Sequence, residues 1–375
     1  MLKTLLHNNN LRRFWLVSVL TVAVIDSSII FTVGAKLERT VSPLVVASSQ
    51  DTLDAEALLE QSDDSSLINP YVIFHSRKSG TQLHDLNGSH WQAGLNAFHK
   101  SDMQVAVQNF RAILDDNEGL SSSDRAAAAF WTYRALSATG DKKTAKYYLD
   151  LAADETPGFY SIMARHISGK DVIAPHMQMN MALAYATRKS SRTLYPMPNW
   201  TPSSGYQVEQ ALLFAIMRQE SRFDPNAESS MGAQGVMQLM PDTAHAMARN
   251  IKLSGSMGEP AVSMALGQQY IMHLMEINSI GNNLVYLLAA YNAGPSMLGK
   301  WQNNIAYKDD PLLFIESIPY RPTRDYVINV ISNYWVYSQL FGSTNSSLAM
   351  ISQGKWPLYA GMTGQVASVK TARLD

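Results

Sequence analysis

Cysteine is absent from this 375-residue chain, and that absence removes several kinds of chemistry. Disulfides, thiolate nucleophiles, cysteine-based zinc sites and a lipid anchor on an N-terminal cysteine are all excluded. Charge is also scarce, because 16% of the residues are charged, the formal net charge is −1 and no block is rich in lysine and arginine. The sequence therefore argues against nucleic acid as a main partner.

Metal-binding patterns are missing as well. The nine histidines are scattered and none belongs to a His-Glu-x-x-His pair, so the sequence predicts no metal site. Apolar residues are plentiful, at 46% of the chain. At this length they can fill the cores of two modest domains with appendages.

The first 35 residues resemble an export segment. The basic residues Lys3, Arg12 and Arg13 precede an apolar stretch over residues 14–35, which is long enough to span a bilayer. Asp26 near its middle would cost about 2.5–3.5 kcal/mol on insertion. A cleaved signal peptide and a retained inner-membrane anchor both fit, and both place the chain in the periplasm or cell envelope. A buried core helix is the less favoured alternative.

Residues 36–87 are polar without lasting periodicity and are expected to be a linker. Residues 88–170 are expected to form a short TPR-like helical repeat region, because one pattern recurs 39 residues later. The recurring residues are Asp102, Ala106 and Phe110, matched by Asp141, Ala145 and Leu149. The region is expected to pack against or present the next domain, with binding of a partner or a glycan as the alternative.

A connector over residues 171–194 leads to a second helical domain over 195–341, and residues 342–375 are expected to be a flexible tail. Capping and proline signals place the helices of this domain. The expected signals are a capping box from Ser204 to Gln207, helix starts at Pro241, Pro260, Asn283, Pro311 and Pro322, and a stop at Gly294-Pro295.

Glu220 closes a helix whose preceding residues 211–217 are all apolar. At 100° per residue its side chain falls between Leu213 and Ile216, inside the apolar arc. Such surroundings raise the pKa of a carboxyl, so it can hold a proton near neutral pH and give it to a leaving oxygen. The alternative is a helix-end glutamate paired with Arg218 or Arg222.

Three further segments carry polar residues in an ordered combination. The first has two glycines three residues apart, which permit a tight turn close to a ligand. The second puts a phenol and an amide at a helix end. The segments are Ser229-Ser-Met-Gly-Ala-Gln-Gly-Val-Met-Gln238-Leu-Met240, Ala-Ala-Tyr291-Asn292-Ala-Gly294, and Glu316-Ser-Ile-Pro-Tyr-Arg-Pro322-Thr-Arg-Asp-Tyr326-Val.

With Glu220, these segments resemble the catalytic domain of soluble-lytic-transglycosylase-type enzymes over about residues 195–340. The resemblance implies a mainly all-α chain with a lysozyme-like catalytic domain. It also implies that Glu220 is the single catalytic acid/base. The residues that match the family's substrate-binding positions are Ser229, Gln238, Met240, Tyr291 and Asn292.

One position departs from the family pattern. Pro322 stands where many members have a glutamate, so a carboxylate of the cleft is missing. Glu316 matches a different family position and cannot simply replace it. The departure bears on substrate contacts more than on the reaction.

The resemblance implies a cofactor-free cleavage of the β-1,4 bond between N-acetylmuramic acid and N-acetylglucosamine in peptidoglycan, with 1,6-anhydromuramic products. Peptidoglycan strands are thus the expected partner, with an envelope protein on the helical repeats as a second one. The alternatives are a hydrolytic lysozyme-like muramidase and a non-catalytic envelope scaffold or glycan-binding protein.

Overall fold

The computed structural model describes residues 88–115, 119–173, 195–343 and 346–361. Throughout these ranges the regular structure is helical, and the only β-type pairings are isolated bridges, so the predicted mainly all-α class is confirmed. In the described part of the chain no helix is both long and apolar enough to cross a membrane. The expected export segment and linker lie outside the described residues.

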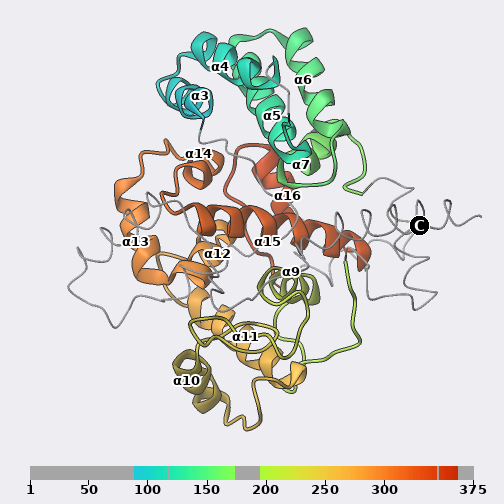
Figure 1. Cartoon of the computed structure of the whole chain (residues 1–375), viewed down its shortest axis with the longest axis vertical. Helices are drawn as coiled ribbons and strands as arrows, with labels where there is room; N and C mark the ends of the chain where they lie inside the picture. Colours follow the sequence, from blue (N-terminus) through green and yellow to red (C-terminus); the bar gives the residue numbers. More distant parts are fainter. Residues whose placement is uncertain (1–87, 116–118, 174–194, 344–345, 362–375) are drawn as a thin grey trace, which may run out of the picture. The chain divides into compact units, whose positions relative to one another are not determined.

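Two helical pairs and a fifth helix make up the N-terminal region (Figure 1). The second helix of each pair begins after an aspartate of the repeated pattern: Asp102 accepts a hydrogen bond from the Val105 N–H at 3.3 Å, and Asp141 accepts from the Thr144 N–H at 3.1 Å. The helices are α3 (Ser89–His99), α4 (Met103–Asp115), α5 (Ser122–Thr139), α6 (Lys142–Asp154) and α7 (Phe159–Ile167). The repeated aspartates are therefore equivalent helix caps.

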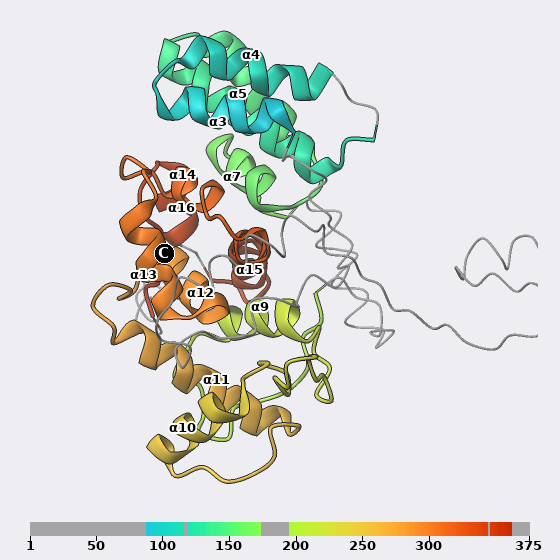
Figure 2. The same cartoon turned by 60° about the vertical axis from the view of Figure 1, so that its left-hand side comes forward.

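Among the residues described from 195 onward there are eight helices (Figure 2). Their bounds are α9 (Gln210–Glu220), α10 (Pro241–Ile251), α11 (Pro260–Met275), α12 (Leu284–Ala293), α13 (Pro295–Asn304), α14 (Pro311–Glu316), α15 (Arg321–Leu340) and α16 (Ser346–Ser352). The helix starts predicted at Pro241, Pro260 and Pro311 are confirmed, because proline fits the first helical turn.

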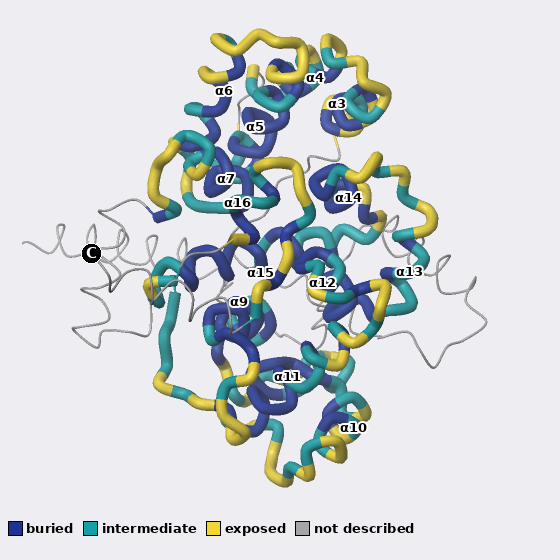
Figure 3. The backbone as a smooth tube through the Cα atoms, turned by 180° about the vertical axis from the view of Figure 1, so that it is seen from behind, coloured by how far each residue is buried: buried dark blue, intermediate teal, exposed yellow. Residues whose placement is uncertain are grey.

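The core of this region forms where α15 packs against α9 and α12, and α15 also contacts α7 of the N-terminal region. Figure 3 shows α9 and α12 buried along most of their length. In α9 the residues Leu212, Leu213 and Phe214 have no exposed surface. Each such side chain contributes roughly 1.5–3 kcal/mol by leaving water, so the helix that ends at Glu220 is firmly anchored.

Three details differ from expectation. The capping box is wrong: α9 begins at Gln210, and the Ser204 hydroxyl accepts instead from the Gln268 amide at 2.8 Å. Gly294-Pro295 ends α12 but also opens α13, which was not predicted.

The expected loose tail is partly ordered. It contains α16, and beyond that helix the Tyr359 hydroxyl accepts from the backbone N–H of Glu209 at 2.8 Å. Tyr359 is 5% exposed, so its buried aromatic ring anchors this segment. The polar composition of the segment gave no indication of such an anchor.

Candidate active site

Glu220 is the last residue of α9 and retains 7% of its surface exposed. Burial removes water from the charged form and raises the pKa of this carboxyl to about 8, while a hydrogen bond from Tyr326 of α15 opposes the rise. The carboxyl therefore holds its proton at neutral pH. It is suited to give that proton to a leaving oxygen.

Tyr326 and Tyr291 interact with this carboxyl, and Tyr270 packs against Tyr291. The ring of Tyr291 on α12 stacks on Tyr326 with centroids 6.4 Å apart and planes 8° apart, and lies 5.3 Å from the ring of Tyr270 on α11. Burial, and then the charge of Glu220, raise the pKa of Tyr291 well above its usual value. Burial also raises the pKa of Tyr270 to about 12. Tyr291 and Tyr270 are therefore neutral while Glu220 titrates.

The hydroxyl of Tyr291 has a fixed partner. It donates to the backbone carbonyl of Met237 at 2.9 Å. Because its one hydrogen is committed there, the phenol oxygen can only accept from a ligand. An electron-rich oxygen in that place suits a centre that develops positive charge.

The loop over residues 227–240 carries Gln238, Ser229 and Met240. The Gln238 amide donates to the carbonyls of Ala227 at 2.8 Å and Gly235 at 2.9 Å, and its own backbone has a φ of 48°. The Ser229 hydroxyl accepts from the Ala233 N–H at 2.9 Å. In this structure both side chains therefore shape the loop.

The loop is tied to the helix that carries Glu220. The Ser221 hydroxyl donates to the Val236 carbonyl at 2.9 Å, and the Met237 N–H donates to the Ser263 hydroxyl of α11 at 3.2 Å. Gly235 has a φ of 75°, and an added Cβ would come within 2.7 Å of Ser263 Oγ, so only glycine fits there. Close packing thus brings the loop to the end of α9.

Of the predicted site residues, Glu220 and Tyr291 come together directly. Gln238, Ser229 and half-buried Met240 lie on the loop that Tyr291 reaches through Met237. Asn292 is 3% exposed and accepts from the Thr323 hydroxyl of α15 at 2.6 Å, so its side chain joins two helices. The substrate-binding roles of these residues stay predictions.

Tyr326 was not predicted as a site residue from the sequence, although it lies in the motif that begins at Glu316. The same motif holds Pro322, the second residue of α15, half-buried beside Thr323. Glu316 does not stand in for the missing carboxylate. It accepts from the Tyr160 hydroxyl of α7, and its pKa is raised by burial.

Within the described ranges no group of three or more acidic or histidine side chains is arranged to hold a metal ion. The pKa of Glu220 is set by burial and Tyr326, with no contribution from another carboxylate. The geometry is that of a site with one buried acid.

Comparison with known proteins shows which sequences this chain resembles. The model of the transglycosylase SLT domain matches residues 199–314. The soluble lytic murein transglycosylase of Salmonella typhimurium is 34% identical over 157 residues, which are 40% of this chain and 24% of that protein. The membrane-bound lytic murein transglycosylase F of Aeromonas salmonicida is 36% identical over 91 residues, 23% of this chain and 17% of that protein. The chain thus spans about a quarter or less of the length of these relatives.

Solved structures extend the likeness in fold. The lytic transglycosylase Slt of Pseudomonas aeruginosa, crystallised as an inactive glutamate-to-glutamine mutant, aligns with a TM-score of 0.54 at 21% identity, over 70% of this chain and 53% of that one. The 70 kDa soluble lytic transglycosylase of Escherichia coli aligns with a TM-score of 0.53 at 19% identity, over 83% and 57%. Residues 199–314 of this chain therefore match the transglycosylase SLT domain, and in sequence the chain is similar to soluble lytic murein transglycosylases.

Proposed function

We propose that this protein cleaves the β-1,4 bond between N-acetylmuramic acid and N-acetylglucosamine in peptidoglycan without adding water, and that it leaves 1,6-anhydromuramic ends. One observation carries the proposal: within an SLT domain, the buried carboxyl of Glu220 has a pKa raised to about 8. Glycosidases usually employ two carboxylates, one on each side of the bond. In this site the described residues support a role for one carboxylate, that of Glu220.

In the proposed reaction, Glu220 first gives its proton to the glycosidic oxygen, and the bond from that oxygen to the anomeric carbon of muramic acid breaks. The resulting carboxylate takes the proton of the muramic acid 6-hydroxyl, whose oxygen forms the new bond to the same anomeric carbon. Glu220 ends protonated, as it began, so no water or cofactor is consumed. The substrate's N-acetyl group assists, and the accepting oxygen of Tyr291 faces the developing positive charge.

The proximity of the 6-hydroxyl is what replaces water in this scheme. An internal nucleophile held in place gains a large effective concentration over a free one. Exclusion of water from the reacting groups favours the internal nucleophile further, and Glu220 is only 7% exposed.

Mass spectrometry of products released from purified sacculi tests the proposal. Anhydro ends are lighter than hydrolysed ends by one water, and we expect them to predominate. Predominantly reducing muramic ends would replace the proposal with the hydrolytic, lysozyme-like alternative. No released products from the folded protein would favour the glycan-binding scaffold instead.

The proposed place of work is the cell envelope, since relatives include both soluble and membrane-bound murein transglycosylases. We assign the export or anchoring step to residues 1–35, the catalytic unit to residues 195–341 and a supporting helical unit to residues 88–170. A reporter fused after residue 87 should be active only outside the cytoplasm. A reporter that works only when it is made in the cytoplasm contradicts export.

A further inference from the structure

Residues 356–359, which follow α16, form a strap over the start of α12. The backbone N–H of Leu284, the first residue of α12, donates to the Pro357 carbonyl at 2.8 Å. The Tyr359 N–H donates to the Asn282 carbonyl, also at 2.8 Å. The strap is therefore joined to the start of α12 by backbone hydrogen bonds in both directions.

The same strap holds the start of α9. Glu209, the N-cap of α9, makes no side-chain capping bond to this helix, whereas the side chain of Asn283 caps α12. The Glu209 N–H donates to the Tyr359 hydroxyl at 2.8 Å, and the buried Glu209 carboxyl accepts from the Tyr334 hydroxyl of α15 at 2.5 Å. A helix end without a local cap depends on partners from elsewhere in the fold, and here two phenols supply them.

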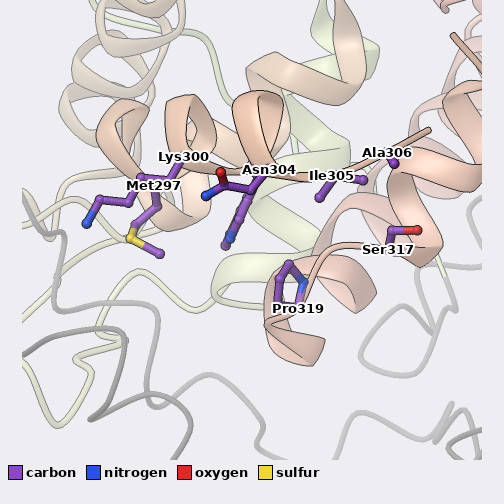
Figure 4. A pocket seen from close by; sticks show the side chains of 8 residues that line it. Met297, Lys300, Asn304, Ile305, Ala306, Ser317 and Pro319 are labelled. Atoms are coloured by element: carbon purple, nitrogen blue, oxygen red, sulfur yellow. The ribbon is translucent and has the colours of Figure 1, made fainter. Parts of the chain in front are cut away.

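The strap is itself fixed at its first residue. The Trp356 indole N–H donates to the Asp309 carboxylate at 2.6 Å, and the Trp356 ring lies edge-on to Tyr307 with centroids 5.6 Å apart. Asp309 and Tyr307 belong to the segment between α13 and α14, in which Ile305 and Ala306 line a pocket beside α13 (Figure 4). This third attachment limits how far the strap can shift relative to α12.

Both helices that start at the strap end at the active site. Glu220 is the last residue of α9, and Tyr291 lies in the last turn of α12. The two helices have 11 and 10 residues, so each rises about 15–17 Å between the strap and the site. Because a packed interior is barely compressible, a shift of one helix at the strap moves its far end as well. The distance between the Glu220 carboxyl and the Tyr291 phenol thus depends on the strap.

We propose that Tyr359 is a positioning residue for the reaction: by holding the start of α9, it keeps the Glu220 carboxyl buried and aligned with Tyr291. The proposal rests on the proposed function, in which Glu220 is the proton donor. Tyr359 lies at the opposite end of α9 from Glu220 and so acts only through the helix. Without its hydroxyl, the uncapped start of α9 can move, and the carboxyl at the other end gains water.

Added water at Glu220 has a measurable effect on its pKa. Burial is the main cause that raises the pKa of this carboxyl to about 8, and the groups that interact with it are Tyr326 of α15 and Tyr291 of α12. A better hydrated carboxyl has a pKa closer to 4.5. A change that only lowers the free energy of unfolding leaves the pKa in the folded protein where it is.

The experiment follows the Glu220 carboxyl of the full chain by NMR with carbon-13 in the glutamate side chains, and Glu220→Gln assigns its signal. Tyr359→Phe, which keeps the ring, should lower the pKa of Glu220 by about 0.5 or more. Turnover on sacculi should fall about threefold to tenfold, with little change in the binding of glycan fragments, because small misplacements of a catalytic group cost rate. Tyr337→Phe is the matched control, since this buried hydroxyl donates to a backbone carbonyl away from the strap, that of Pro196, at 2.9 Å.

An unchanged pKa of Glu220 in Tyr359→Phe would overturn the proposal, even if the variant is less stable. A pKa that falls equally in Tyr337→Phe would overturn it too, because any lost buried hydroxyl would then loosen the site. Tyr359→Leu, which also removes the ring, should lower the pKa further, and circular dichroism checks the folding of each variant. The titration needs no turnover, so the proposed function is judged separately, by the anhydro ends that the parent protein releases.

Discussion

Tyr160 of α7 donates its hydroxyl hydrogen to the buried carboxylate of Glu316, the last residue of α14. The other end of α14 is held in the same way: Asp310, its N-cap, accepts from the guanidinium of Arg134 on α5. Side chains of the N-terminal helices thus fix both ends of a six-residue helix. Residues 317–320 connect that helix directly to the start of α15 at Arg321.

Replacing Tyr160 with phenylalanine should destabilise the protein. The change keeps the ring but leaves the Glu316 carboxyl, which is 7% exposed, without its phenol donor. Hydrogen bonds to charged groups contribute about 1.5–3 kcal/mol, so the free energy of unfolding in urea should fall by about that much. Tyr147→Phe is the matched control, because Tyr147 is 63% exposed. Equal stability of the two variants would show that the bond to Glu316 contributes nothing.

Glu220→Gln should abolish cleavage and also change how stability depends on pH. In the folded protein the pKa of Glu220 is raised from 4.5 to about 8. Between these values the unfolded chain ionises while the folded one does not, so this residue's favourable contribution is present below pH 4.5 and lost by about pH 8. Glutamine cannot ionise, and the variant should gain up to roughly 5 kcal/mol relative to the parent over that window.

Urea titrations of both proteins at several pH values measure this difference. Below pH 4.5 the two free energies of unfolding should be similar, since the carboxyl is neutral in both states. A difference that stays constant from acid to alkaline pH would mean that the Glu220 pKa is not raised. In the same range, kcat/KM of the parent should decline as pH passes about 8, because the proton donor is then lost.

Tyr291→Phe should lower turnover more than it weakens glycan binding. The substitution keeps the stacking on Tyr326 but removes the bond to the Met237 carbonyl and the oxygen beside Glu220. Loss of the buried bond alone costs about 1–3 kcal/mol of stability. Tyr206→Phe is a matched control, because Tyr206 also donates to a backbone carbonyl, at 2.7 Å, but to that of Trp200.

Turnover on sacculi and binding to glycan fragments are measured for both tyrosine variants. Equal losses of turnover and binding in Tyr291→Phe would argue against a role in the transition state. If Tyr206→Phe loses as much turnover as Tyr291→Phe, the loss in Tyr291→Phe is explained by lower stability of the protein and not by a role of Tyr291 in the reaction.

Pro322→Glu should be tolerated and should strengthen substrate binding. Position 322 is in the first turn of α15, where proline fits and where a carboxylate is favoured by the helix dipole. A restored carboxylate can accept a hydrogen bond from the glycan, which would lower KM between about twofold and tenfold. Pro322→Gln separates the charge from the size. An unchanged KM in Pro322→Glu would mean that the substrate does not reach this turn.

Local signals made several elements predictable. Pro241, Pro260 and Pro311 mark helix starts because the first turn needs no N–H from that residue. A helix was expected to start at Asn283, and this residue is the N-cap of α12, with its side chain accepting from two backbone N–H groups. The apolar arc around Glu220 indicated burial, and the structure places this carboxyl there.

Other features depend on contacts that no local pattern records. Glu316 and Tyr160 are 156 residues apart in the sequence, so no local sequence pattern predicts the hydrogen bond between them. Gln238 has a φ of 48°, and its amide donates to the Ala227 carbonyl. Both features follow from how the loop packs, and residue types alone do not determine that packing. The sequence from Ser204 to Gln207 predicted a capping box, but the Ser204 hydroxyl accepts a hydrogen bond from the Gln268 amide of α11. Here a tertiary contact overrides a local preference.

The two ends of α14 close chain segments of 176 and 156 residues, from Arg134 to Asp310 and from Tyr160 to Glu316. Contacts between residues so distant along the chain form late, since the entropy of closing the intervening segment is lost before they contribute. During synthesis the N-terminal helices emerge first and can fold before α14 exists. The segment that leads into α15 would then be among the last parts of the protein to reach its native position.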